Sequence, residues 1–142
     1  MVVFSVPGKP KGKARARTKK NGQTYTPKET VEYEDKVKAY YLESQPRQKF
    51  FNKEPLAVGI YARFEIPKRT TKAEKLAMMR GDKDPTVKPD ADNIAKIICD
   101  ALNGLAYGDD SQIVNLTVSK TYIRQEDMQP HVTVTIESLR GD

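Results

Sequence analysis

Five stretches of the chain have the hydrophobic pattern or the composition of β-strands. Residues 2–6 and 56–66 are rich in β-branched and aromatic side chains, and each stretch is followed by a proline. In residues 113–122 apolar side chains alternate with polar ones, which predicts a strand with one buried face. Residues 131–136 alternate in the same way and are predicted to return as the hairpin partner of 113–122. A short return strand is expected at 23–26.

Two segments have the spacing of α-helices. Thr26-Pro27 favours a helix start, and the apolar pattern carries this helix to about Ser44. Between residues 94 and 105, apolar side chains recur every three or four residues. At about 100° per residue, the opposite face of that second helix collects five polar side chains: Asp92, Asn93, Lys96, Asp100 and Asn103.

Residues 68–88 form the most loop-like region of the chain, and they contain many cations. One or two helical turns are expected around residues 73–79. We interpret the region as a mobile loop before the candidate site, by default one with no fixed role. A lid or a second contact surface is the alternative.

These elements predict an α+β fold, with a mixed sheet of about four main strands and two principal helices packed against it. A chain of 142 residues is long enough for one domain, here 1–142. Its apolar content of 37% is low and its charged content of 31% is rather high, so a modest core with long polar loops is expected.

Neither a secretory signal nor a membrane-spanning run is recognisable in the sequence. The single cysteine, Cys99, excludes an internal disulfide and a cysteine-rich zinc cluster. The expectation is a cytoplasmic protein with no membrane partner. Neither Cys99 nor the single histidine, His131, is given a role.

The net charge of +6 comes from one segment, residues 9–20. This segment holds seven cations and no acid, and without those seven, 18 cations face 19 acids in the rest of the chain. A concentration of this kind indicates contact with a polyanion, because a generally basic surface would spread the charge.

Every odd position from residue 9 to residue 17 is basic. If the backbone is extended there, these side chains share one face at intervals of about 6.6–6.8 Å, which is close to the phosphate repeat along a nucleic-acid strand. A solvated, disordered loop is the alternative. The predicted nucleic-acid contacts are Lys9, Lys11, Lys13, Arg15 and Arg17, together with Lys88.

Four carboxylates cluster in the sequence around the second helix: Asp90 and Asp92 at its start, and Asp109 and Asp110 after it. Carboxylates brought together repel one another unless some are protonated or a cation neutralises them. Oxygen ligands without nearby histidine or cysteine suit Mg²⁺ or Mn²⁺. Beside a polyanion-binding segment, such an ion would serve phosphodiester hydrolysis.

Lys96 follows Asp92 by one helical turn, and Asp100 follows Lys96 by another. Lys96 could therefore pair with these acids at rest or meet the scissile phosphate. A simpler interpretation also exists: Asp90 or Asp92 would cap the helix, and the pair at 109–110 would form a turn. The spacing alone leaves catalysis and capping both open.

The residues around these acids resemble the signature of the RusA family of Holliday-junction resolvases. The resemblance rests on Lys88-Pro89-Asp90-Ala91-Asp92-Asn93, Lys96, Asp100-Ala101-Leu102 and Asp109-Asp110-Ser111-Gln112-Ile113-Val114. Pro7-Gly8-Lys9-Pro10 and Tyr25-Thr26-Pro27 are similar to the N-terminal half of that family. The resemblance implies a homodimeric, magnesium-dependent endonuclease that binds four-way DNA junctions and nicks two opposed strands.

By the family pattern, Asp90, Asp92 and Asp110 would be the metal-binding catalytic carboxylates and Lys96 the catalytic lysine. The residues that would lie around them are Asp100, Asp109 and Asn93. No small-molecule cofactor is implied, and members are commonly encoded by phages or prophages, so a setting in recombination, repair or phage replication is expected. The alternatives are a nuclease acting on flaps or other branched DNA, and a non-catalytic basic DNA-binding module.

Overall fold

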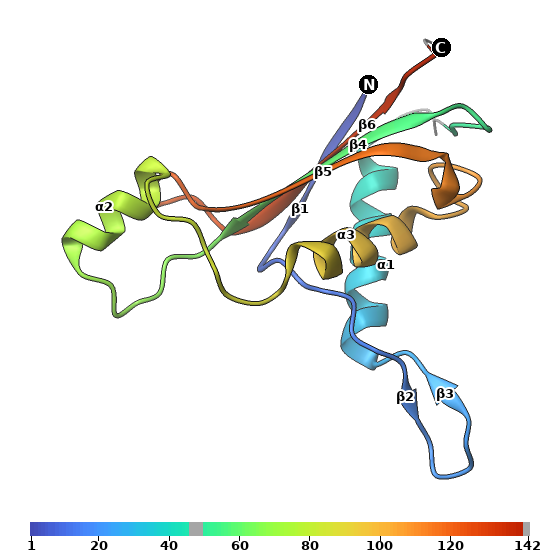
Figure 1. Ribbon diagram of the computed structural model, residues 1–142, viewed down its shortest axis with the longest axis horizontal. Helices are drawn as coiled ribbons and strands as arrows, with labels where there is room; N and C mark the ends of the chain where they lie inside the picture. The colour runs from blue at the N-terminus through green and yellow to red at the C-terminus, as the bar shows by residue number, and fades with distance from the viewer. Residues whose placement is uncertain (46–49, 141–142) are drawn as a thin grey trace.

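The centre of the structure, a computed structural model that describes residues 1–45 and 50–140, is a four-stranded mixed sheet (Figure 1). Its strands are β1 (Val2–Pro7), β4 (Leu56–Phe64), β5 (Ile113–Tyr122) and β6 (His131–Ser138). They stand in the order β1-β6-β4-β5. β1 and β4 both run antiparallel to β6, whereas β4 and β5 run parallel. The predicted α+β fold with a mixed four-stranded sheet is confirmed.

The predicted hairpin between residues 113–122 and 131–136 is wrong, because β6 pairs with β1 and β4. Its buried side chains continue rows of buried side chains on both neighbours. These rows are Val2-Ile136-Val58, Phe4-Val134-Ile60 and Val6-Val132-Ala62. On β5, by contrast, Val114 and Leu116 are 64% and 47% exposed. In its central position, β6 has an apolar row of β1 on one side and an apolar row of β4 on the other, so its own apolar side chains are buried. Pairing with β5 would place them beside exposed side chains.

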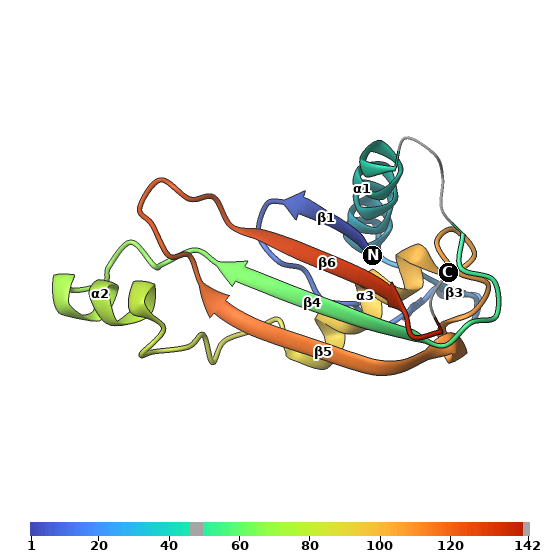
Figure 2. The ribbon, with the colours of Figure 1, turned by 90° about the horizontal axis from the view of Figure 1, so that it is seen from above.

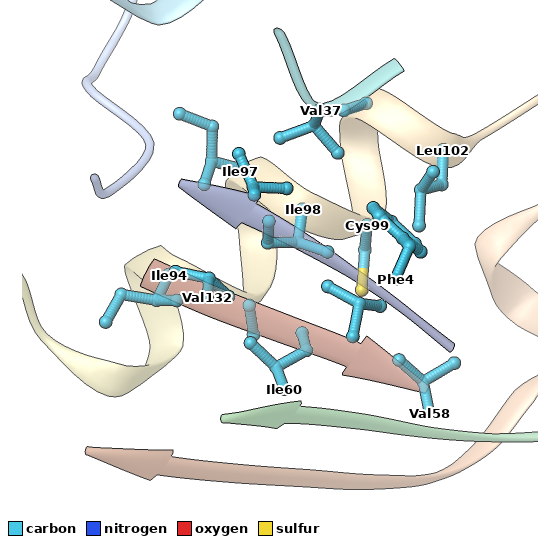
Figure 3. Close-up of a cluster of buried hydrophobic side chains, with 14 of the residues drawn as sticks. Phe4, Val37, Val58, Ile60, Ile94, Ile97, Ile98, Cys99, Leu102 and Val132 are labelled. Atoms are coloured by element: carbon cyan, nitrogen blue, oxygen red, sulfur yellow. The ribbon is translucent and has the colours of Figure 1, made fainter. Parts of the chain in front are cut away.

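Two helices, α1 (Lys28–Ser44) and α3 (Ala91–Leu102), cover the same face of this sheet (Figure 2). The close-up shows Ile94, Ile98 and Cys99 of α3 in one cluster with side chains from the strands (Figure 3). The apolar stripe that the sequence predicts on this helix is therefore the stripe that packs against the sheet. Within the described ranges, no helix is both long and apolar enough to cross a bilayer.

The helix α3 begins and ends earlier than the apolar segment 94–105 predicts. The backbone N–H of Ile94 donates to the carbonyl oxygen of Asp90 at 3.0 Å, so the first turn already includes the acidic motif. At the other end, Gly104 has a φ of +81°, which turns the chain away from the helix axis. Leu105 therefore follows the helix and packs against the core from the turn.

A third helix, α2 (Lys72–Arg80), lies within the predicted loop 68–88, where the sequence indicated only one or two turns. The hydroxyl of Thr71 accepts a hydrogen bond from the first turn at 3.2 Å. Gly81, with a φ of +87°, ends the helix, and the Arg124 guanidinium donates to two carbonyl oxygens of its last turn. The region thus holds an element capped at both ends, which lies at one end of the sheet (Figure 2).

A small hairpin projects from the body beyond the start of α1 (Figure 1). It consists of β2 (Arg17–Thr18) and β3 (Thr24–Tyr25), which pair antiparallel. The Lys19 ammonium lies 5.8 Å from the centre of the Tyr25 ring, within the range of a cation–π contact. The short return strand expected at 23–26 is confirmed, and we call residues 14–25 the hairpin arm.

Tyr33 on α1 gives a prediction about stability. Its side chain is buried, and its hydroxyl finds no hydrogen-bond partner among the described residues. Burial raises the pKa of this phenol from 10 to about 12. Removing an unpaired buried hydroxyl in Tyr33→Phe should raise the free energy of unfolding by about 1 kcal/mol at pH 7.

The same substitution should alter the alkaline limb of stability. Above pH 10 the unfolded phenol loses its proton while the folded one keeps it until about pH 12, so the wild type loses stability over this window. At pH 11 the advantage of Tyr33→Phe should grow by a further ~1.4 kcal/mol. Urea unfolding at pH 7 and pH 11 measures both values. Exposed Tyr40→Phe is the control, and a destabilised Tyr33→Phe variant would contradict the prediction.

Candidate active site

The polar face of α3 borders an open cavity of about 350 Å³ next to the edge strand β5. The side chains of Asp92, Lys96 and Asp100 reach it from three successive turns of the helix. Asp110 reaches it from the 3₁₀ turn η1 (Asp110–Gln112) that precedes β5. Residues separated by the whole length of α3 and the loop after it are therefore brought to one hollow.

Neither acid at the start of α3 caps this helix. Asp90 occupies the N-cap position, but its carboxylate accepts no capping hydrogen bond. Asp92 lies inside the first turn. An acid in the first turn of a helix is favoured by the helix dipole, so both carboxylates are tolerated here while they stay available for other contacts.

The two acids after the helix divide their roles. The Asp109 carboxylate accepts a hydrogen bond from the backbone N–H of Ser111 at 3.2 Å. Hydrogen bonding with the side chain of Ser111, and then with its backbone, lowers the pKa of Asp109. The Gln112 amide oxygen accepts the backbone N–H groups of Gly108 and Asp109 in return. Asp109 therefore caps the turn and does not line the cavity, whereas the next residue, Asp110, does.

Gln112 also ties this turn to the body. Its amide nitrogen donates to the carbonyl oxygens of Phe51 and Glu54, both at 3.1 Å. Since the Gln112 amide bonds at both ends, the loop that carries Asp110 is fixed to the segment before β4. The hydrogen bonds of the Gln112 side chain thus fix the backbone that holds Asp110 over the cavity.

A second cavity, of about 370 Å³, lies on the other side of the first turn of α3. Asp90 and Asn93 reach it from the helix start. Lys11 and Lys88, two of the predicted nucleic-acid contacts, reach it from chain segments that are far apart in sequence. A cation-lined hollow therefore adjoins the carboxylate-lined one, and Asp90 and Asp92 face different sides of the same turn.

Within the described residues, no three acidic, histidine or cysteine side chains stand close enough together to hold an ion. Asp92 and Asp110 share a cavity, while Asp90 does not line it. The chemistry of the donors nevertheless fits a hard cation, since the ionisable donors facing the cavity are carboxylates. Burial raises the pKa of the Cys99 thiol in the cavity wall to about 11, so no thiolate competes.

The predicted row of cations sharing one face is wrong. The Lys13 ammonium points inward, 2.8 Å from the Glu34 carboxylate and 3.2 Å from the Asp100 carboxylate. Lys9 pairs with Glu65 at 3.0 Å on the surface. Pro10 is buried beneath this stretch, so the segment 10–13 is docked against the body and is not a free extended strand. Arg15 and Arg17 are exposed at the base of the hairpin arm.

Glu34 is the site residue that the sequence reasoning missed. It lies on α1, three residues before Val37 and seven before Tyr41, both of which are fully buried. Only 15% of its side chain is exposed. A charged residue on the buried stripe of a helix indicates a paired charge, and this signal was available in the sequence.

Two comparisons with known proteins bear on this arrangement. The family described as "Endodeoxyribonuclease RusA" matches residues 7–137, a range that contains every residue of both cavities. A protein of Bacillus subtilis (strain 168) named "Uncharacterized protein YqaN" is 33% identical over 148 aligned positions, which cover 97% of this chain and 96% of that protein. The chain belongs to the RusA endodeoxyribonuclease family.

Proposed function

We propose that this protein is a Mg²⁺-dependent endonuclease that resolves four-way (Holliday) DNA junctions by paired symmetric nicks, and that Mn²⁺ can replace Mg²⁺. One observation carries the proposal: in a chain of the RusA family, Asp92, Asp110 and Lys96 share a cavity that adjoins a lysine-lined one. Carboxylates for an ion and cations for a phosphate backbone are the two requirements of phosphodiester hydrolysis.

Asp92 and Asp110 would hold the ion, with Asp90 as the third ligand. Support for Asp90 comes from its free carboxylate, which no capping hydrogen bond commits to the helix end. When bound, Mg²⁺ supplies an activated water and neutralises charge on the attacked phosphate. Asp109 is outside this ligand set, because its carboxylate is bonded within its own turn.

The cations of the chain would act on the substrate. Lys96 faces the carboxylate-lined cavity and would stabilise negative charge that develops on the phosphate. Contacts to phosphates position DNA without reading its bases. The residues that would make them are Lys9, Lys11, Arg15, Arg17 and Lys88.

A homodimer would account for paired nicks, since each subunit contributes one site and a two-fold axis relates the two cuts. The symmetry of such a dimer would match that of a four-way junction. The setting would be recombination, repair or phage replication in the cytoplasm.

Cleavage of defined DNA substrates tests the activity. Wild-type protein with Mg²⁺ should nick a four-way junction at symmetric positions in two opposed strands, and EDTA should abolish the nicks. A flap and a linear duplex of the same sequence serve as matched substrates. Single nicks on the flap alone would identify a structure-selective nuclease of another kind, and binding without cutting on any substrate would identify a non-catalytic module.

Two charge-removing variants test the roles of the carboxylates. Asp92→Asn and Asp110→Asn should each lower the single-turnover cleavage rate by about 100-fold or more. Junction affinity should stay equal or rise, because a negative charge is removed from a site that binds a polyanion. Exposed Asp127→Asn, in the turn before β6, is the control. Weaker DNA binding by the cavity variants would count against the assignment.

The exposed cations at the base of the hairpin arm give a salt-dependent prediction. The slope of log K against log[salt] is negative, and each lost phosphate contact makes it less negative by about 0.9. Arg15→Ala/Arg17→Ala should therefore make the slope less negative by up to about 1.8. Lys72→Ala/Lys75→Ala on α2 removes the same charge and should leave the slope unchanged. An equal change of this slope in both double variants would mean that α2 also contacts DNA.

A further inference from the structure

The inward-pointing Lys13 joins three segments of the chain. Its ammonium lies within 3.2 Å of carboxylates from α1 and α3, those of Glu34 and Asp100. The side chains of Lys13 and Glu34 are only 19% and 15% exposed, and that of Asp100 is 30% exposed. An ion pair with so little contact with water is weakly screened and holds its partners in a fixed geometry.

The backbone around Lys13 is clamped as well. Its N–H donates to the carbonyl oxygen of Asn93 at 2.9 Å. At Gly12, an added Cβ would stand 2.9 Å from the Cβ of Pro89 and 3.0 Å from that of Asn93. We call residues 10–13 the strap. A side chain at position 12 would push the strap away from the start of α3, so glycine is required for this close approach. The strap therefore lies directly against the turn that carries Asp90 and Asp92.

The charge balance at the cluster favours a permanently ionised lysine. Burial alone would lower the pKa of Lys13, but its hydrogen bonds to Glu34 and Asp100 more than compensate, so the pKa lies above the ordinary value. Asp100 shares the cavity with Asp92 and Asp110. Neutralising Asp100 reduces the repulsion among these three acids.

The cluster also connects the hairpin arm to the site by both of its legs. The strap leads into β2, and β3 leads through Pro27 into α1, which carries Glu34 (Figure 1). Lys13 on the first leg and Glu34 on the second therefore meet at Asp100 of α3. A shift of either leg would have to break a partly buried ion pair.

We propose that Lys13 is a positioning residue: with Glu34 and Asp100, it fixes the hairpin arm relative to the carboxylates at the start of α3. This inference rests on the proposed nuclease function, in which the arm holds the DNA backbone and the carboxylates act on one phosphate. The distance between the hairpin arm and these carboxylates then decides which phosphodiester is cut. Lys13 itself contacts protein carboxylates in place of the DNA phosphates that the sequence predicted for it.

The variant Lys13→Met tests the proposal, and Lys75→Met is its control. Both variants remove one positive charge. Lys13→Met breaks the two ion pairs of Lys13, and Lys75→Met breaks the pair that Lys75 of α2 makes with Glu126 at 2.7 Å. Amide hydrogen exchange in residues 10–16 should rise about tenfold in Lys13→Met alone. Junction affinity should match that of Lys75→Met, while the single-turnover rate falls by about 10- to 100-fold and the nicks spread over neighbouring phosphodiesters.

Three results would overturn the proposal. Unchanged exchange in the strap would mean that Lys13 does not hold it. A wild-type nick pattern and rate in Lys13→Met, despite faster exchange, would mean that the anchoring does not position the reaction. An affinity far below that of Lys75→Met, with nick positions kept, would make Lys13 a DNA contact.

Two further measurements keep the outcome decisive. If circular dichroism shows that Lys13→Met does not fold, the same measurements are made on Glu34→Gln. This variant keeps Lys13 and removes one of its two carboxylate partners. If the wild type cuts no DNA, the proposed function fails. Hydrogen exchange in the strap then still shows whether Lys13 anchors the arm.

Discussion

Burial of the apolar stripe of α3 is the interaction on which the rest of the structure depends. Ile94, Ile97 and Ile98 are fully buried, and each contributes about 1.5–3 kcal/mol. A polar contact at the opposite face is worth only about 0.5–1.5 kcal/mol. Hydrophobic packing therefore decides the rotation of the helix. Because the stripe faces the sheet, Asp92 and Lys96 must face the hollow beside β5.

The positions of the strands could be predicted from the sequence, but their pairing could not. Each strand carries its own alternation, which is a local property. The alternation predicts the buried face on β1 and β6 but not on β5, where Val114 and Leu116 are exposed. The alternation at 131–136 does not say which strands will stand on either side. Only the matching rows on β1 and β4 decide this, and they lie far away in the chain. The predicted end of α3 was wrong for a local reason. Leu105 continues the apolar spacing of the helix, but Gly104 already turns the chain away from it.

For the candidate site, the sequence singled out the segments that line the two cavities and left the side-chain geometry open. The pair at 109–110 offers two equal acids, and only the bonds within the turn show that Asp109 is a cap and Asp110 faces the cavity. The basic row looked uniform, yet Lys13 has two carboxylate partners whose positions depend on how α1 packs beside α3. A pattern of charges along a chain cannot reveal such a contact, because the partners come from distant segments.

Cys99 gives this molecule a built-in reporter. It is the chain's only thiol, and it lies on α3, 8% exposed, in the wall of the carboxylate-lined cavity. Because so little of the thiol is exposed, local opening of α3 would speed its reaction with a thiol-reactive dye, so the labelling rate reports on that opening. Local opening of α3 can thus be followed in the unaltered protein, and a ligand that suppresses this opening would slow the modification.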